Sequence, residues 1–362
     1  MATLGLSMIV KNESDVLSRA LDGIKDVVDE IVIVDTGSTD DTVEIARRYT
    51  NKVYAFDWIN DFSAARNFAL SKTTSDYYIW LDADDVVPLP TAAAVKKLMR
   101  RKAIDFDIVM LPYVVATDAS GNPTYTYYRE RIIKNTPAYR FDGAVHEAVA
   151  LSGNIIKINK PVFHGKPQSR SNGTRNLDIY ESLLRGGRTL NARERYYYAR
   201  ELYYNGRVQD AAKQLSQFLS MDDGFYVNKA DACLLLSECY RQMHDFNSAL
   251  QAALYRFAFT LPDGEVCCLI GSLFISENDY KSAAYWYKQA LKSKPDYKSG
   301  AFVQTDYYGF IPLVWLTVCY DKLGDDKKAF RYHCRAKKLN PFDKSVINND
   351  AYFAALGFSD TP

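Results

Sequence analysis

The sequence has almost no net charge, since 45 Lys and Arg residues stand against 44 Asp and Glu residues in 362 positions and leave a formal charge of +1. A chain so evenly balanced has no general attraction to nucleic acid or to an anionic membrane. We therefore expect no nucleic-acid partner. The content of 48% hydrophobic and 25% charged residues also excludes a disordered or collagen-like chain.

Long hydrophobic runs are missing as well. No segment reaches the ~18 uninterrupted apolar residues that a membrane span requires. No basic leader stands before an apolar run with a small-residue cleavage site. The sequence thus predicts a cytoplasmic protein without a membrane span.

Cysteine is scarce and confined to the second half of the chain. No two of the six cysteines have the Cys-x-x-Cys spacing of a zinc site. All of them fall in stretches that read as apolar helix faces, which is typical of small buried hydrophobic residues. These positions are Cys233, Cys239, Cys267, Cys268, Cys319 and Cys334.

The length predicts two or more domains at roughly 150 residues each, and the first half has the pattern of an α/β fold. Short β-branched or aromatic runs alternate there with helical patterns, the first of which is expected to begin from a cap at Ser14. Ligands of such sheets bind beyond the carboxyl ends of the strands. The expected strands are 4–10, 31–34, 53–56 and 77–81, so the segments 11–13, 35–37 and 82–85 should meet at one edge.

From about residue 188 the pattern is helix, turn, helix, and it repeats. A small residue recurs early in the second helix of each unit, at Ala211, Ala249, Ala283 and Ala329. The intervals between these alanines are 38, 34 and 46 residues. A helical pair of about 34 residues is typical of tetratricopeptide repeats. An irregular all-helical domain remains the alternative, and an insertion at 299–311 interrupts the pattern.

Four motifs of the first half resemble those of the family 2 glycosyltransferases. They are Met-Ile-Val-Lys-Asn-Glu at 8–13, Asp-Glu-Ile-Val-Ile-Val-Asp-Thr-Gly-Ser-Thr-Asp at 29–40, Phe-Ser-Ala-Ala-Arg-Asn at 62–67 and Leu-Asp-Ala-Asp-Asp at 81–85. The resemblance implies a Rossmann-like GT-A domain that uses a nucleotide-diphosphate sugar, expected over 1–170. A connecting helix or linker at 171–187 and an all-α repeat domain at 188–362 would follow. This fusion is similar to a bacterial subgroup that glycosylates peptides or proteins, including bacteriocin S-glycosyltransferases.

A diphosphate leaving group usually requires a divalent cation, and Mg²⁺ or Mn²⁺ prefers carboxylate ligands. Asp82 and Asp84 lie at the end of a strand, where alternation places both on one face if the extended geometry persists. The resemblance implies that Asp84 binds the metal directly and that Asp82 contacts the ribose or a metal-bound water. His164 lies where such enzymes often bring a late histidine to the metal, and Asp85 is a weaker candidate. The alternative is a solvated acidic turn with a structural histidine.

Asp35 ends a buried strand and therefore needs a partner. The resemblance implies that it contacts the uracil ring, whereas its alternative role is to cap the next helix. Lys11 and Glu13 would lie around the base and ribose, or be surface charges. The planar donor fork of Arg66 suits a diphosphate, unless it is a surface residue. Arg129 and Arg131, which alternate along an expected strand, could face the phosphates or the acceptor.

Inverting transfer also needs a base near the acceptor. The segment 141–147 follows the acidic motif by about 60 residues and pairs a histidine with a carboxylate. Glu147 is our candidate base, and His146 either orients it or takes its place. Asp142 is a third candidate. The structural alternative places His146 in the core and pairs Glu147 with Arg140.

The sequence therefore predicts a metal-dependent inverting glycosyltransferase that moves a hexose from a UDP-sugar to a peptide or protein. The repeats would hold the acceptor or form a homodimer, since repeat solenoids present extended concave surfaces. Two alternatives stay open. One is transfer to a surface polysaccharide or lipid-linked saccharide, and the other is an inactive scaffold that only binds a nucleotide sugar. The sequence identifies neither the sugar nor the attacked atom.

Overall fold

The computed structural model describes residues 2–118, 121–165, 173–297 and 300–359. The chain divides into two compact units, each with its own buried core. One unit contains residues 1–116 and 126–189, and the other contains 117–125 and 190–362. Among the described residues, no helix combines the length and the apolar composition needed to cross a membrane.

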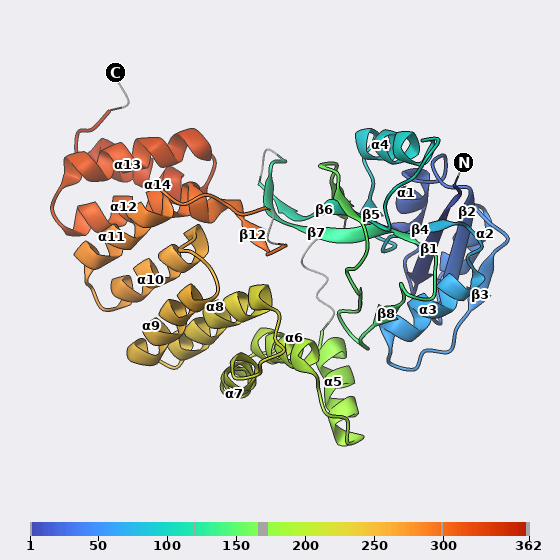
Figure 1. Ribbon diagram of the computed structural model, residues 1–362. Coiled ribbons are helices and arrows are strands. Elements are labelled where there is room, and N and C mark those ends of the chain that lie inside the picture. The colour runs from blue at the N-terminus through green and yellow to red at the C-terminus, as the bar shows by residue number, and fades with distance from the viewer. Residues whose placement is uncertain (1, 119–120, 166–172, 298–299, 360–362) are drawn as a thin grey trace. The chain divides into compact units, whose positions relative to one another are not determined.

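The first unit is built on a mixed sheet with the strand order β3-β2-β1-β4-β7-β6-β11-β5, and β10 pairs with β6 (Figure 1). The strands β1, β2, β3 and β4 are parallel, whereas β7 is antiparallel to β4. The bounds are β1 Leu4–Val10, β2 Glu30–Asp35, β3 Val53–Ala55, β4 Tyr77–Trp80, β5 Asp85–Val86, β6 Ile108–Thr117, β7 Pro123–Lys134, β10 Ile155–Lys157 and β11 Val162–His164. A separate antiparallel pair is formed by β8 Phe141–Asp142 and β9 Ala148–Val149.

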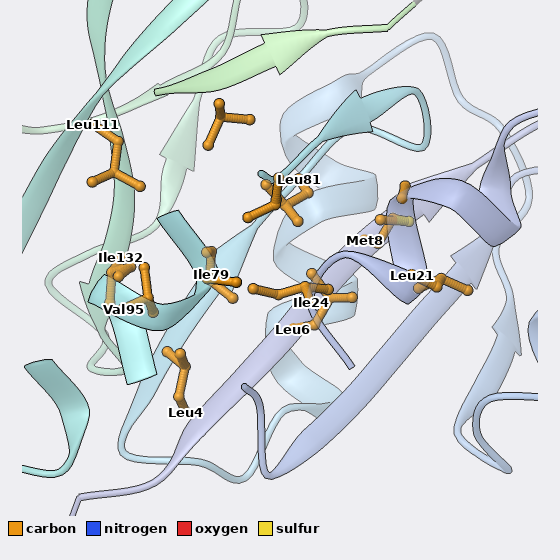
Figure 2. Close-up of a cluster of buried hydrophobic side chains, with 14 of the residues drawn as sticks. Leu4, Leu6, Met8, Leu21, Ile24, Ile79, Leu81, Val95, Leu111 and Ile132 are labelled. Atoms are coloured by element: carbon orange, nitrogen blue, oxygen red, sulfur yellow. The ribbon is translucent and has the colours of Figure 1, made fainter. Parts of the chain in front are cut away.

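The core of this unit lies between the sheet and its helices. Figure 2 shows Leu4, Leu6 and Met8 of β1 grouped with apolar side chains from β4 and the neighbouring helices, among them Leu21 and Ile79. Burial of each large aliphatic side chain contributes about 1.5–3 kcal/mol. The helices are α1 Leu17–Asp22, α2 Thr42–Arg47, α3 Phe62–Lys72, α4 Leu89–Met99 and α5 Arg175–Arg185.

The predicted start of the first helix is wrong. The helix α1 begins at Leu17, and its N-cap Val16 has no side-chain cap. The backbone N–H of Ser14 donates instead to Asp40 Oδ2 at 3.2 Å. The residues after β1 are thus hydrogen-bonded to the loop after β2, and the helix begins only at Leu17.

The register of the parallel strands places their carboxyl ends at one edge, as the alternating pattern predicts. Val10 lies opposite Asp35, and Ser7 lies opposite Trp80. Hydrogen bonds join the two loops that follow β1 and β2, because Asn12 N donates to Ser38 Oγ at 2.9 Å. The loops 11–13, 35–37 and 82–85 therefore share this edge of the sheet.

The second unit consists of consecutive helical pairs, which confirms the predicted repeats (Figure 1). The four alanines chosen from the sequence are fully buried, as close packing within each pair requires. The helices are α6 Ala192–Tyr204, α7 Val208–Leu219, α8 Tyr226–Gln242, α9 Phe246–Tyr255, α10 Gly264–Ser276, α11 Tyr280–Ala290, α12 Phe310–Lys322, α13 Asp326–Leu339 and α14 Lys344–Ala355, with the 3-10 turns η1 Arg256–Ala258 and η2 Thr305–Tyr308.

The turns inside the four pairs share one backbone conformation. Gly206, His244, Asn278 and Gly324 all have positive φ, between 59° and 77°. In three of the pairs the next residue is an aspartate that caps the second helix by accepting a backbone N–H three residues on. The turn inside each pair is therefore regular, although the spacing between the alanines is not.

The inserted segment between α11 and α12 packs on the start of α10. Gln304 N donates to Glu265 Oε1 at 3.1 Å, and Tyr308 Oη donates to Glu265 Oε2. A side chain at Gly264 would not fit, since its Cβ would lie 2.6 Å from the carbonyl oxygen of Tyr307. The described part of this insertion, from residue 300, is thus a packed element of the second unit.

Candidate functional site

The acidic loop after β4 is closed by its own hydrogen bonds. Asp85 N donates to Asp82 O at 3.0 Å, and Asp82 N donates to Asp85 Oδ2 at 2.9 Å. The following strand β5 pairs antiparallel with β11, where His164 lies opposite Asp85. This pairing brings the loop next to a histidine that is 79 positions further along the chain.

Three side chains of this region form a group that could hold a metal ion. Asp84, Asp85 and His164 each offer one ligand atom, and these atoms lie within 4.8 Å of one another. His164 Nδ1 is 3.5 Å from Asp84 Oδ2 and 3.0 Å from the Tyr113 hydroxyl. Oδ1 of Asp85 is buried and accepts no hydrogen bond from the residues that the structure describes. Two carboxylates and an imidazole suit Mn²⁺ or Mg²⁺.

Asp82, the third residue predicted for the metal, lies outside this group and pairs with Arg66. Arg66 Nη2 is 2.7 Å from Asp82 Oδ1, and the Asp82 side chain remains 40% exposed. Burial alone would raise the pKa of Asp82, but Arg66 and Arg131 outweigh it and hold the pKa at about 2. Asp82 is therefore a permanent carboxylate at the edge of the site.

Arg66 is a buried residue of α3 that joins two segments of the site. Its Nε lies 2.5 Å from Glu147 Oε1, while its guanidinium stacks 4.6 Å from the Trp80 ring centroid. Only 6% of Arg66 is exposed, so it is not a surface arginine. Its Nη1 is buried without a hydrogen-bond partner among the described residues. Burial opposes the charge, yet Glu147 and Asp82 raise the pKa of Arg66 above its usual value.

Three guanidinium groups lie over the ring of Trp80. Arg129 and Arg131 of β7 lie 4.7 Å and 4.2 Å from its ring centroid, beside Arg66. Arg131 Nη1 is 3.0 Å from Asp85 Oδ2. Burial raises the pKa of Asp85 to about 6, Arg131 lowers it in part and Asp82 adds to the rise.

The charges around Trp80 fit a divalent cation. Each guanidinium has a carboxylate partner, since Arg66 pairs with Glu147, Arg129 with Glu130 and Arg131 with Asp85. Asp82 shares Arg66 with Glu147, and Asp84 has no guanidinium partner among the described residues, so these five carboxylates exceed the three guanidinium groups by two negative charges. Two such charges are what one divalent cation neutralises.

Asp35 lies at the same edge and organises the turn that follows it. Its carboxylate is 9% exposed and accepts the backbone N–H groups of Gly37 and Ser38 at 3.1 Å. Gly37 has φ of +100°, a conformation that a side chain would strain. Asp35 thus stabilises the turn and does not cap the next helix, because α2 begins at Thr42 with Asp41 at its N-cap position.

Lys11 and Glu13 follow β1 at this edge. Lys11 is exposed, and Glu13 N donates to Thr42 Oγ1 at 2.7 Å. Asn12 between them has φ of +53° and accepts the backbone N–H of Thr39 at 2.7 Å. The structure thus brings Lys11, Glu13 and Asp35 to one side of the sheet.

The candidate base lies in the loop between β8 and β9. Asn67 of α3 bonds both backbone groups of Phe141 at 2.9 Å, which ties this loop to the helix that carries Arg66. Glu147 is 8% exposed and its partner is Arg66, not Arg140, which donates to the carbonyls of Thr136 and Tyr139. His146 has φ of +54° and Asp142 is exposed.

Sequence reasoning missed Trp80 and Tyr113, and it gave Arg131 a different task. Tyr113 bonds His164, and the Arg131 guanidinium lies 4.6 Å from its ring centroid. The aromatic residues just before the acidic loop were the sequence signal available for Trp80, but aromatic residues are equally typical of a buried strand that has no functional role. The pairing of β7 with β4, which brings Arg131 to Trp80, is not visible in a local pattern.

Comparisons with known proteins show which families the two parts of the chain resemble. Residues 6–152 match the family described as glycosyl transferase family 2, and residues 264–297 match a tetratricopeptide repeat. Residues 6–152 form a family 2 glycosyltransferase domain. This glycosyltransferase domain contains the acidic loop, Arg66, Trp80 and Glu147, whereas His164 lies just beyond the matched residues.

Two curated relatives share this domain. A TPR repeat-containing protein of Synechococcus elongatus is 36% identical over 162 residues, which cover 44% of this chain and 39% of the relative. The SPbeta prophage-derived glycosyltransferase SunS of Bacillus subtilis is 27% identical over 259 residues, covering 67% of this chain and 60% of SunS. The matches therefore span less than two thirds of either relative's length.

Among solved structures, BtubC from P. vanneervenii is 19% identical with a TM-score of 0.40, covering 54% of this chain and 79% of that one.

Proposed function

We propose that this protein is a metal-dependent inverting glycosyltransferase that moves a hexose from a UDP-sugar to a peptide or protein acceptor. The helical repeats would hold the acceptor. The reaction would take place in the cytoplasm, in keeping with six cysteines that are all free thiols. The similarity to SunS, a protein named a glycosyltransferase, supports the class of reaction.

One observation carries the proposal. At the carboxyl edge of the sheet, Asp84, Asp85 and His164 converge beside the Asp82–Arg66 pair. A donor diphosphate needs both a cation and fixed positive donors, and this edge offers a metal group next to a buried guanidinium. An inactive scaffold that only binds a nucleotide sugar would not require these charged residues to lie together.

The residues divide the work as follows. Asp84 and His164 would hold Mn²⁺ or Mg²⁺, which when bound would neutralise charge on the leaving diphosphate. Asp82 would contact the ribose, Arg66 would orient Asp82 and Glu147, and Asp35 would contact the uracil.

The acceptor must also lose a proton during the transfer. As the acceptor oxygen or sulfur bonds the anomeric carbon, the bond from that carbon to the diphosphate oxygen breaks. The acceptor proton then passes to Glu147, with His146 and Asp142 as the other bases within the same loop. Lys11 and Glu13 would border the base and ribose and would take no part in the chemistry.

A panel of UDP-sugars tests the proposal. The purified chain is incubated with Mn²⁺ and each donor, and UDP release is measured with peptide, glycan or glycolipid acceptors. We expect one donor to be consumed fastest with a peptide acceptor. Transfer to glycan or glycolipid alone would overturn the acceptor class, and no UDP release with any donor would overturn the activity.

Two variants make this experiment specific. Asp84→Asn should abolish Mn²⁺-dependent UDP release, because it removes a proposed metal ligand. Asp222→Asn removes the same charge from an exposed position of the repeats and should leave release unchanged.

A further inference from the structure

We infer that the ion pair of Asp85 with Arg131 is a positioning device that holds the acidic loop and His164 in the arrangement that binds the cation. The inference rests on the proposed function, because the cation is the one that the transferase would use. It concerns two residues that do not need to touch the donor.

Asp85 connects three parts of the site through separate atoms. Its Oδ2 accepts the backbone N–H of Asp82 at 2.9 Å and lies 3.0 Å from Arg131 Nη1. Its backbone pairs with that of His164 across β5 and β11. The position of Asp85 therefore fixes both the direction of the loop that presents Asp84 and its distance from His164.

Arg131 is itself held on two sides. It is fully buried, and its guanidinium lies over two rings, 4.2 Å from the Trp80 centroid and 4.6 Å from the Tyr113 centroid. Its Nη1 also donates to the Trp80 carbonyl oxygen at 3.2 Å. Trp80 ends the strand that leads into the acidic loop, and Tyr113 bonds His164. Arg131 thus contacts the supports of both metal candidates.

Arg131 neutralises the buried Asp85, but its charge does not favour the cation itself. A buried positive charge beside a cation site repels the cation. Nε and Nη2 of Arg131 also have no hydrogen-bond partner among the described residues, which adds an unfavourable desolvation term. We conclude that Arg131 contributes through geometry, in the way that outer partners of metal ligands orient them.

The direction in which Arg131→Gln changes the Mn²⁺ affinity distinguishes a positioning role from a purely electrostatic one. Arg131→Gln removes a positive charge, so charge alone predicts tighter Mn²⁺ binding. Positioning predicts weaker binding, by roughly 10–100-fold. Affinity is measured on the full chain by electron paramagnetic resonance with Mn²⁺ alone, after circular dichroism has shown that each variant is folded.

Arg129→Gln is the matched control. Arg129 lies on the same strand and over the same Trp80 ring at 4.7 Å, but its carboxylate partner is Glu130 at 3.6 Å. The control removes the same charge without touching Asp85, so its Mn²⁺ affinity should be equal to or tighter than that of the unchanged protein.

Arg131→Lys decides the question if Arg131→Gln fails to fold. Lysine keeps the charge but loses the planar group that stacks on both rings, so positioning predicts weaker Mn²⁺ binding and charge predicts no change. Unchanged or tighter binding in the folded Arg131 variants would overturn the inference while the unchanged protein still released UDP. Absence of UDP release from the unchanged protein would instead overturn the proposed function, and absence of Mn²⁺ binding would overturn the inference.

Discussion

At the scale of single residues, two repeat turns place an ordinary side chain where the other two have glycine. His244 and Asn278 have φ of +59°, in the region that costs L-residues roughly 1–2 kcal/mol. Both are exposed, so their side chains gain little from packing. These turns store local strain that the surrounding helices maintain.

Replacement of His244 by glycine should therefore stabilise the repeat unit. We expect His244→Gly to raise the free energy of unfolding by about 0.5–1 kcal/mol, since the relief of strain is partly offset by the entropy of glycine. Asn278→Gly should have a smaller effect, because asparagine tolerates this conformation better. Urea unfolding measures both. Gly206→Ala is the control with the opposite sign, and a destabilised His244→Gly would contradict the account.

Glu147 provides the residue-scale test of catalysis. Glu147→Gln keeps the size of the side chain and removes its ability to take a proton, so turnover should fall by roughly 10²–10⁴-fold. Binding of UDP should change little. Asp142→Asn, in the same loop but exposed, is the matched comparison. Near-normal turnover of Glu147→Gln would transfer the role to His146 or Asp142.

At the scale of elements, the sequence predicted the strands well and the long-range pairs poorly. The first strand was expected at 4–10 and is Leu4–Val10, because a short, mostly apolar and buried run is a local signal. The contact of Arg66 with Glu147 joins residues 81 positions apart and depends on how α3 meets the β8 loop. Local periodicity therefore located the edge of the sheet, but not which charges meet there.

The inserted segment at the start of α10 predicts a pH dependence. Burial and Asp263 raise the pKa of Glu265 from 4.5 to about 7, while Tyr308 and the Gln304 N–H oppose the rise. The folded state thus binds the proton more tightly than the unfolded state, so this group's contribution to stability is lost as pH rises from about 4.5 to 7. A shift of this size corresponds to about 3 kcal/mol.

Glu265→Gln should remove that dependence. Relative to the unchanged protein, the variant should gain stability between pH 5 and pH 7, on the order of 2–3 kcal/mol. Urea unfolding at the two pH values measures the difference, and a constant offset between the proteins cancels in the comparison. Parallel pH profiles would show that Glu265 titrates normally.

At the scale of the whole molecule, one chain joins a family 2 glycosyltransferase domain to helical repeats. The family and the repeats were recognisable from sequence because their motifs are local. The bounds of the two compact units were not recognisable from sequence, since residues 117–125 belong with the repeats although they lie within the first half of the chain. The proposed activity requires that the first unit bind donor and metal together.

The binding of UDP with and without metal tests this central claim most directly. Isothermal titration calorimetry of the full chain is performed with Mn²⁺ and again with excess chelator, alongside Asp84→Asn. We predict tight UDP binding only with Mn²⁺, and weak binding by Asp84→Asn under both conditions. UDP affinity that is unchanged by the chelator would contradict the assignment of Asp84 and His164 to the metal.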